Sequence, residues 1–343
     1  ATAFTRALLA TTHENIPEGR VLREDWGGTP WYRPDEHGHV WNNDYFGGDL
    51  KGIEEKLPYL ADLGVTCLYL NPIFESHENH RYNTANYRKV DPLLGTNEDF
   101  RDLCAAAKEY GISVILDGVF SHTGADSIYF NKYGRYDSVG AFQSKESPYY
   151  SWYLFDEWPN RYEAWWGIDT LPNVQETNAE YLNYICGKGG VLDYWISLGA
   201  AGFRLDVADE LPDSFLDKLR TRVKSNGDDK IVIGEVWEDA SNKEAYGVRR
   251  KYFTAGELDG VINFPFRKAI LDFAAGFDDG GALRETVMTL AENYPAGALD
   301  CTMLILGNHD TERIGTLLPE ANARRAAAFL QFTLPGSPTI YYG

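Results

Sequence analysis

The sequence has no long apolar run, since none of its apolar stretches approaches the roughly 18 residues that a membrane-spanning helix needs. Basic residues are also scarce: 32 Lys and Arg stand against 51 Asp and Glu, for a formal net charge of −19. An acidic surface repels phosphate backbones and anionic lipid head groups. We therefore expect neither nucleic acid nor a membrane as a partner, and we attribute the charge to ordinary solubility.

Cysteine is sparse, and its spacing excludes the common metal motifs. The chain holds Cys67, Cys104, Cys186 and Cys301, which are scattered along the sequence. We expect reduced core or helix residues rather than disulfides, because buried free cysteine behaves as a small hydrophobe. No secretory leader opens the sequence, but it begins with Ala1 rather than Met, so the compartment stays open.

Short apolar runs alternate with helical patterns along most of the 343 residues. We expect strands at 66–70, 112–117, 202–206, 231–235, 258–263, 302–306 and 339–342, and helices at 50–63, 97–110, 179–198, 213–223, 265–275, 281–293 and 320–333. This alternation predicts a parallel sheet with helical crossovers. The length exceeds the roughly 250 residues of a bare eight-stranded α/β barrel and leaves room for an insertion.

Three acidic residues, Asp206, Glu235 and Asp310, each follow one of these apolar runs at its C-terminal end. A carboxylate there is costly to desolvate unless it is paired or used, and barrel enzymes keep their chemistry at that face. A structural ion-pair network is the alternative. Because Arg204 and His309 each lie within two residues of an acid, we favour a polar functional site served by several strands.

Asp206 and Glu235 are candidates for the two carboxylates that glycoside hydrolysis needs. They lie on consecutive expected strands, so they can approach within the roughly 5 to 5.5 Å of a retaining mechanism. Arg204, two residues before Asp206 on the same strand, faces the same way and is expected to hold Asp206 ionised. Glu235 stands between Gly234 and Val236-Trp237, surroundings expected to raise its pKa and keep a proton available.

Four segments resemble, in order and approximate spacing, the four sequence regions of the alpha-amylase superfamily of glycoside hydrolases. They are Asp117-Gly-Val-Phe-Ser-His122, Gly202-Phe-Arg-Leu-Asp206, Gly234-Glu-Val-Trp237 and Gly307-Asn-His-Asp310. The resemblance extends from about residue 44 to the end, and Leu171-Pro-Asn-Val174 is similar to an additional region of that family. Residues 206–210 and 234–240 are most similar to the neopullulanase, cyclomaltodextrinase and maltogenic amylase group.

The resemblance implies a role for each matching position. Asp206 would be the nucleophile that forms a β-glucosyl-enzyme, Glu235 the general acid and then base, and Asp310 a third carboxylate that holds sugar hydroxyls. The implied substrate-binding residues are Tyr82, Asp117, His122, Arg204, His309 and Trp237. Among them, Arg204 would orient Asp206, and His122 and His309 would hydrogen-bond the sugar. Tyr82 would stack beneath that sugar, and Asp117 would support the subsite.

Taken one at a time, these residues have plainer readings. An isolated His122 or His309 is more often a structural histidine, Tyr82 alone would be assigned to a core, and Asp117 could cap the following turn. Their joint occurrence at expected strand ends favours the site.

The fold implied is a (β/α)8 TIM barrel with a small inserted domain after the third strand. Residues 1–122 and 179–343 would form the catalytic barrel, and 123–178 the inserted domain over the cleft, since a loop this long is usually functional. This segment holds four of the nine Trp, and its aromatics are expected to form its own core rather than to stack on sugars. Residues 1–10 lack the first-strand pattern that the resemblance implies, and by the same resemblance we expect the last helix and the C-terminal β-domain to be missing. Either the chain is a fragment, or an unpaired barrel edge invites association, for example as a homodimer.

The predicted function is hydrolysis of α-1,4-glucosidic bonds, and as a further option α-1,6 bonds, in maltodextrins, cyclodextrins, pullulan or starch. The reaction would retain the configuration of the anomeric carbon. An α-glucosidase or a glucanotransferase of the same superfamily is one alternative. Another is a non-catalytic carbohydrate-binding or assembly relative, which should have lost a catalytic carboxylate, whereas all three are present. No cofactor is required. Structural calcium is not expected, because Ser121 stands where amylases commonly carry an Asn ligand, and a hydroxyl is a poorer ligand for a hard cation.

Overall fold

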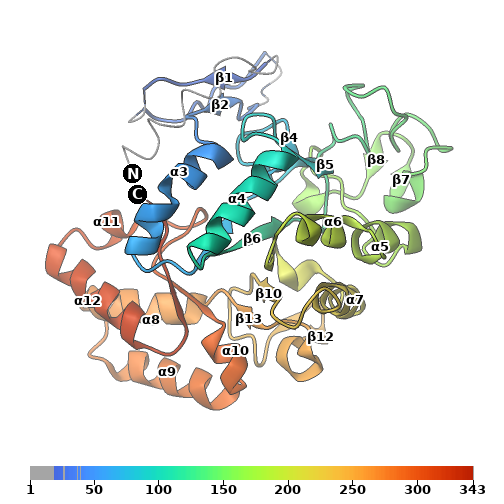
Figure 1. Cartoon of the computed structure of the whole chain (residues 1–343). Coiled ribbons are helices and arrows are strands. Elements are labelled where there is room, and N and C mark those ends of the chain that lie inside the picture. The colour runs from blue at the N-terminus through green and yellow to red at the C-terminus, as the bar shows by residue number, and fades with distance from the viewer. Residues whose placement is uncertain (1–18, 26–27, 37, 39, 343) are drawn as a thin grey trace. The chain divides into compact units, whose positions relative to one another are not determined.

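The computed structural model describes residues 19–25, 28–36, 38 and 40–342 (Figure 1). The chain forms two compact units. Unit 1 comprises residues 1–203 with 222–230, and unit 2 comprises residues 204–221 with 231–343. The predicted inserted domain, 123–178, lies wholly within unit 1. The expectation about residues 1–10 concerns a segment outside the described residues.

Two parallel strands of unit 1 follow the sequence prediction. Strand β3 (Cys67–Leu70) pairs with β6 (Ser113–Gly118), and residue Ala201, just before β9 (Gly202–Leu205), donates its N–H to the carbonyl of Val114 at 2.7 Å. Helices α3 (Leu50–Asp62) and α4 (Asn97–Glu109) precede these strands and pack against each other (Figure 1). Each has a side-chain N-cap, Asp49 for α3 and Thr96 for α4, which satisfies a backbone N–H of the first turn.

An antiparallel hairpin in unit 1 was not predicted. Strand β4 (Phe74–Ser76) pairs with β5 (Thr84–Val90), and a second small sheet joins β1 (Val21–Leu22) to β2 (Asp44–Tyr45) in parallel. The loop between β4 and β5 carries Tyr82. The hairpin therefore fixes both ends of the loop that holds one predicted substrate-binding residue.

The prediction of a single helix over 179–198 was wrong. Two helices occur, α5 (Ala179–Cys186) and α6 (Val191–Ser197), and glycines separate them. A Cβ on Gly190 would lie 2.7 Å from the carbonyl oxygen of Ile185, so the chain can turn there only with glycine. After the turn α6 places Trp195 in the core, where it stacks on Phe74 with ring centroids 4.8 Å apart.

The segment 123–178 contains little regular structure, as predicted. It has two short 3₁₀ turns, η1 (Tyr150–Trp152) and η2 (Trp165–Gly167), and one short hairpin of β7 (Phe155–Glu157) and β8 (Arg161–Tyr162). Phe130 is fully buried, with ring centroids 4.8 Å from Tyr153 and 4.7 Å from Tyr162. Much of its aromatic content thus forms a local core, as expected.

Unit 2 also contains parallel strand pairs. The end of β9 lies beside β10 (Ile231–Gly234), and β10 pairs in parallel with β13 (Gly260–Val261). A parallel bridge joins Ile262 to Met303 at the start of β14 (Met303–Ile305), which pairs in parallel with β15 (Ser337–Thr339). The last strand thus ends at Thr339, the residue at which the predicted strand 339–342 begins.

Helices of unit 2 lie close to the predicted ranges. They are α7 (Asp213–Lys224), α8 (Phe264–Ala274), α9 (Gly281–Asn293) and α12 (Ala321–Thr333). The last three residues of α7 belong to unit 1. Helix α8 packs against both α9 and α12 (Figure 1). Two short helices, α10 (Ala296–Asp300) and α11 (Ile314–Leu317), were not predicted. The smaller elements are η3 (Ala208–Glu210), β11 (Glu244–Ala245), β12 (Val248–Arg249) and the π-helical turn η4 (Tyr252–Gly256).

All four cysteines are free, as predicted, and Cys104 and Cys186 are buried. Cys67 is exposed, so its assignment to a core was wrong. Among the described residues, every helix is too short or too polar to cross a membrane.

Candidate active site

Arg204 and Asp206 lie together at the end of β9, as the strand periodicity predicted. The Arg204 side chain is fully buried and its Nη1 donates to Oδ1 of Asp206 at 2.9 Å. Asp206 is 7% exposed. The pair therefore places an ion-paired carboxylate at the C-terminal edge of a strand, with a small part of its surface open to solvent.

Glu235 follows β10, and the same guanidinium holds it. Nη2 of Arg204 lies 2.8 Å from Oε2 of Glu235, and the N–H of Val207 donates to that oxygen at 2.9 Å. The indole N–H of Trp237 donates to the other oxygen, Oε1, at 3.1 Å. Glu235 is 5% exposed, and each of its two carboxylate oxygens accepts a hydrogen bond. The sequence predicted the contact of Arg204 with Asp206 but not its contact with Glu235.

Val207 has a backbone conformation that β-branched residues rarely adopt. Its φ is +39° and its ψ 54°, in the left-handed region. This conformation is the one in which the Val207 N–H reaches Glu235. Strained backbone of this kind concentrates at functional sites, where the surrounding structure enforces it.

Trp237 is fixed beside the acids by stacking as well as by its hydrogen bond. Its ring lies on that of Phe264, with centroids 3.9 Å apart and an interplanar angle of 10°. It remains 46% exposed. The indole therefore offers an apolar surface within reach of Glu235, which suits the predicted substrate-binding role.

Asp310 lies in the loop after β14 and is oriented by its neighbours. The amide Nδ2 of Asn308 donates to Oδ2 of Asp310 at 3.2 Å, and the Asp310 N–H donates to Oδ1 of Asn308, also at 3.2 Å. Nε2 of His309 lies 3.2 Å from Oδ2 of Asp310. The predicted pair of His309 and Asp310 is thus in contact within unit 2, with Asn308 as an orienting residue.

Three of the remaining predicted residues form a group in unit 1. Asp117, at the end of β6, is almost fully buried, and its Oδ2 accepts hydrogen bonds from the hydroxyls of Tyr82 at 2.8 Å and Tyr69 at 2.6 Å. Nε2 of His122 lies 3.0 Å from the backbone carbonyl of Tyr82. Tyr82 is therefore held through both its side chain and its backbone.

His122 is a neutral, internally bonded histidine in this group. Because a carbonyl only accepts, Nε2 carries the proton, and Nδ1 then accepts from the hydroxyl of Ser121 at 3.0 Å. Burial lowers the pKa of His122 to about 4. A hydrogen bond from His122 to a sugar requires it to exchange one of these partners. The Ser121 hydroxyl thus orients the His122 ring.

The predicted site residues thus form three groups of described residues. Arg204, Asp206, Glu235 and Trp237 form the first, and His309 with Asp310 the second, both in unit 2; Tyr82, Asp117 and His122 form the third, in unit 1. The sequence did not single out four orienting residues: Tyr69, Val207, Phe264 and Asn308. Asn308 stands inside a quoted motif and could have been found. In the described part of the chain, no three His, Cys, Asp or Glu side chains gather as a metal site.

Residues 10–343 match the model of the alpha amylase catalytic domain. The chain belongs to this family of glycoside hydrolases, whose catalytic domain is a (β/α)8 barrel. This membership confirms the family and the barrel that the four motifs predicted.

The named relatives include a cyclomaltodextrinase, which belongs to the predicted group, and an amylopullulanase, which the prediction did not name. The chain is 40% identical to an amylopullulanase of Thermoanaerobacterium saccharolyticum over 92% of its length and 36% identical to a cyclomaltodextrinase of Thermoanaerobacter pseudethanolicus over 87%. It spans only 27% and 50% of these two relatives. A solved structure, the cyclic alpha-maltosyl-(1→6)-maltose hydrolase from Arthrobacter globiformis, matches with a TM-score of 0.83 at 32% identity, over 96% of this chain and 69% of that one.

Proposed function

We propose that the chain is the catalytic part of a retaining glycoside hydrolase that cleaves α-glucosidic bonds through a covalent glucosyl-enzyme. The observation that carries the proposal is the guanidinium of Arg204, which contacts Asp206 at 2.9 Å and Glu235 at 2.8 Å. Two buried carboxylates at neighbouring strand ends, aligned by one cation, supply the pair of groups that glycoside hydrolysis requires.

The proposed first step uses both carboxylates at once. An oxygen of Asp206 attacks the anomeric carbon as the bond from that carbon to the leaving oxygen breaks, and Glu235 gives its proton to that oxygen. The products of this step are an Asp206 glucosyl ester and the shortened glucan. Arg204, as an ion-pair partner of Asp206, orients the attacking carboxylate.

In the second step Glu235, now a carboxylate, takes a proton from water, which attacks the anomeric carbon and releases Asp206. The donors around Glu235 suit this half of the reaction, because Val207 and Trp237 both hydrogen-bond to it as an acceptor. Asp310, oriented by Asn308, is proposed to bind sugar hydroxyls together with His309. No cofactor enters either step.

We propose that Tyr82, supported by Asp117 and His122, stacks on the glucosyl unit beside the cleaved bond. Its hydroxyl and carbonyl are already bonded within unit 1, so its ring is held in a defined orientation. Residues 123–178 are proposed to act as the inserted domain that shapes specificity. Segments of this kind carry function on loops held by a rigid scaffold.

The proposed substrates are maltodextrins, cyclodextrins, pullulan or starch, with α-1,4 bonds as the main target. We include α-1,6 bonds in the proposal because one relative is named an amylopullulanase and another a cyclic alpha-maltosyl-(1→6)-maltose hydrolase. Products from maltoheptaose, β-cyclodextrin and pullulan would separate these preferences, since specificity resides in loops rather than in the barrel.

The test compares the unmodified chain with Asp206→Asn and with Asp272→Asn, an acid of helix α8 paired with Lys268. We expect Asp206→Asn to lower turnover of maltoheptaose by at least about 10³-fold, because it removes the nucleophilic charge with little change of shape. Asp272→Asn should retain activity. Proton NMR of the first products should show the α anomer. Unchanged hydrolysis by Asp206→Asn would refute the nucleophile, and the β anomer would refute retention.

A further inference from the structure

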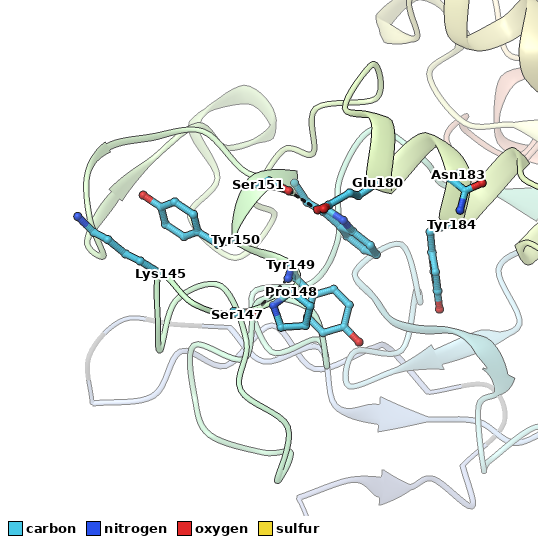
Figure 2. Close-up of a pocket in the computed structure, with 10 residues that line it drawn as sticks. Lys145, Ser147, Pro148, Tyr149, Tyr150, Ser151, Glu180, Asn183 and Tyr184 are labelled. Carbon is cyan, nitrogen blue, oxygen red and sulfur yellow. Dashed lines mark hydrogen bonds between the residues drawn. The ribbon is translucent and has the colours of Figure 1, made fainter.

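A groove of about 550 Å³ lies in unit 1, between the loop 145–152 and helix α5 (Figure 2). This volume is within the roughly 300 to 1,000 Å³ of small-molecule sites. Its lining contains none of the residues assigned above to catalysis or to substrate binding. Tyr149, Tyr150 and Tyr184 bring aromatic rings to it, and Ser151, Glu180 and Asn183 bring polar groups.

The aromatic side of the groove is held rigidly. Trp152, which is 3% exposed, packs against Tyr149 with ring centroids 4.9 Å apart and against Tyr184 at 5.2 Å. The hydroxyl of Tyr184 lies 2.9 Å from that of Tyr129. Tyr150 stacks on Phe155 at 5.3 Å with an interplanar angle of 7°, and keeps part of its surface exposed. The rings thus form a fixed apolar surface.

The polar side of the groove offers donors and acceptors close to these rings. The Ser151 hydroxyl donates to Oε2 of Glu180 at 2.7 Å, which fixes the carboxylate next to the loop (Figure 2). Asn183, one turn further along α5, is exposed and presents an amide with two donors and an acceptor. Groups of this kind pair with neighbouring hydroxyls of a bound molecule.

The charges of the lining favour an uncharged ligand. Lys145 and Glu180 are its only charged residues, one of each sign, so the groove has no net charge. The chain as a whole carries −19, which disfavours phosphorylated or other anionic ligands. A neutral molecule with apolar faces and many hydroxyl groups meets both the rings and the polar groups.

We propose that this groove is a second carbohydrate-binding site, which holds a stretch of α-glucan chain without using any of the residues assigned to bond cleavage. A glucosyl unit has the required chemistry: a face of C–H groups for the rings and a rim of hydroxyls for Glu180 and Asn183. This proposal rests on the proposed function for its choice of glucan over other neutral sugars. The site would retain a polymer at the protein surface and would add little to the hydrolysis of a short substrate.

The experiment measures binding and cleavage separately. The full chain and the variants Tyr150→Ala, Asn183→Ala and their combination are run in native gels containing increasing soluble starch, and the retardation gives an apparent Kd. The same proteins are assayed with p-nitrophenyl α-maltotrioside. Tyr59→Ala serves as the matched control, because Tyr59 is a 61% exposed tyrosine of helix α3 in the same unit. Circular dichroism and melting temperatures establish that each variant is folded.

We expect the combined variant to raise the apparent Kd for starch roughly five- to tenfold, in line with the loss of one stacked ring and one amide. Its kcat/KM on the trioside should stay within about twofold of the parent, as should both values for Tyr59→Ala. Because Asn183 is an exposed surface residue, its single variant gives a result even if Tyr150→Ala unfolds the loop.

Two outcomes separate this proposal from the proposed function. Equal retardation of the folded groove variants, the control and the parent, with the trioside still hydrolysed, would overturn the groove and leave the catalytic assignment standing. Weakened retardation of the groove variants with no hydrolysis by the parent would support the groove and overturn the catalytic assignment.

Discussion

Glu257 is a buried carboxyl group that should make the protein less stable as pH rises. It follows η4, is 1% exposed, and neither of its carboxyl oxygens has a hydrogen-bond partner among the described residues. Burial, reinforced by the nearby charges of Asp213 and Asp217 and opposed by Arg250 and Lys251, raises its pKa from 4.5 to about 7. In the folded protein Glu257 therefore keeps its proton at pH values where the unfolded chain has lost it.

The sign and size of the effect follow from this difference. Between pH 4.5 and 7 the folded state binds the additional proton, so the free energy of unfolding falls as pH rises through this range. At about 1.36 kcal/mol for each pKa unit, the loss is about 3 kcal/mol by pH 8. Below pH 4.5 the group is neutral in both states and contributes no further change.

Glu257→Gln should remove this dependence, because an amide does not titrate. We expect the variant to be more stable than the parent by about 2 to 3 kcal/mol at pH 8, and equal to it or slightly less stable at pH 4.5. Urea unfolding at pH 4.5, 6 and 8 measures the difference. Glu285→Gln, an exposed acid of helix α9, is the control and should show no such trend. A stability difference between Glu257→Gln and the parent that is the same at all three pH values would refute the argument.

Three further predictions concern the acids and the backbone. Glu235→Gln should lose less activity on an activated aryl glucoside, whose leaving group needs no proton, than on maltoheptaose, and equal losses in kcat/KM would argue against the acid role. Arg204→Lys should reduce both activity and stability, because an ammonium replaces the planar guanidinium that contacts two buried acids. Thermal unfolding should show a loss of about 3 kcal/mol or more in the free energy of unfolding, and an unchanged stability would contradict the bridging contact. Gly190→Ala should destabilise the protein by more than about 1 kcal/mol, because the added Cβ would contact the Ile185 carbonyl. Gly297→Ala in helix α10 is the control and should be neutral or stabilising, because a Cβ there meets open space. Similar unfolding midpoints for the two variants would exclude the packing explanation.

Periodicity predicted those parts of the site that lie on strands. Arg204 and Asp206 share a face because alternate residues of a strand point the same way, and their contact confirms this. The contact between Arg204 and Glu235 depends on the separation of two strand ends, which no local pattern encodes. The left-handed conformation of Val207 was equally hidden, since valine gives no sign of a positive φ.

The fold was predicted best where helices and strands were long and regular. The hairpin of β4 and β5 was missed because its strands are interrupted by bulges and its partner segments lack a clear turn signature. The break between α5 and α6 was a different kind of error. Gly187, Gly189 and Gly190 stood in the sequence as a signal, but the apolar periodicity on either side outweighed it.

The double attachment of Tyr82 affects the thermodynamics of binding. Its hydroxyl is fixed by Asp117 and its carbonyl by His122, so the ring has lost most of its freedom before any ligand arrives. The conformational entropy of this side chain is therefore lost once, during folding, rather than at each association. If Tyr82 receives the sugar as proposed, the affinity of that subsite depends on buried bonds that never touch the ligand, and weakening them would weaken binding without removing a contact.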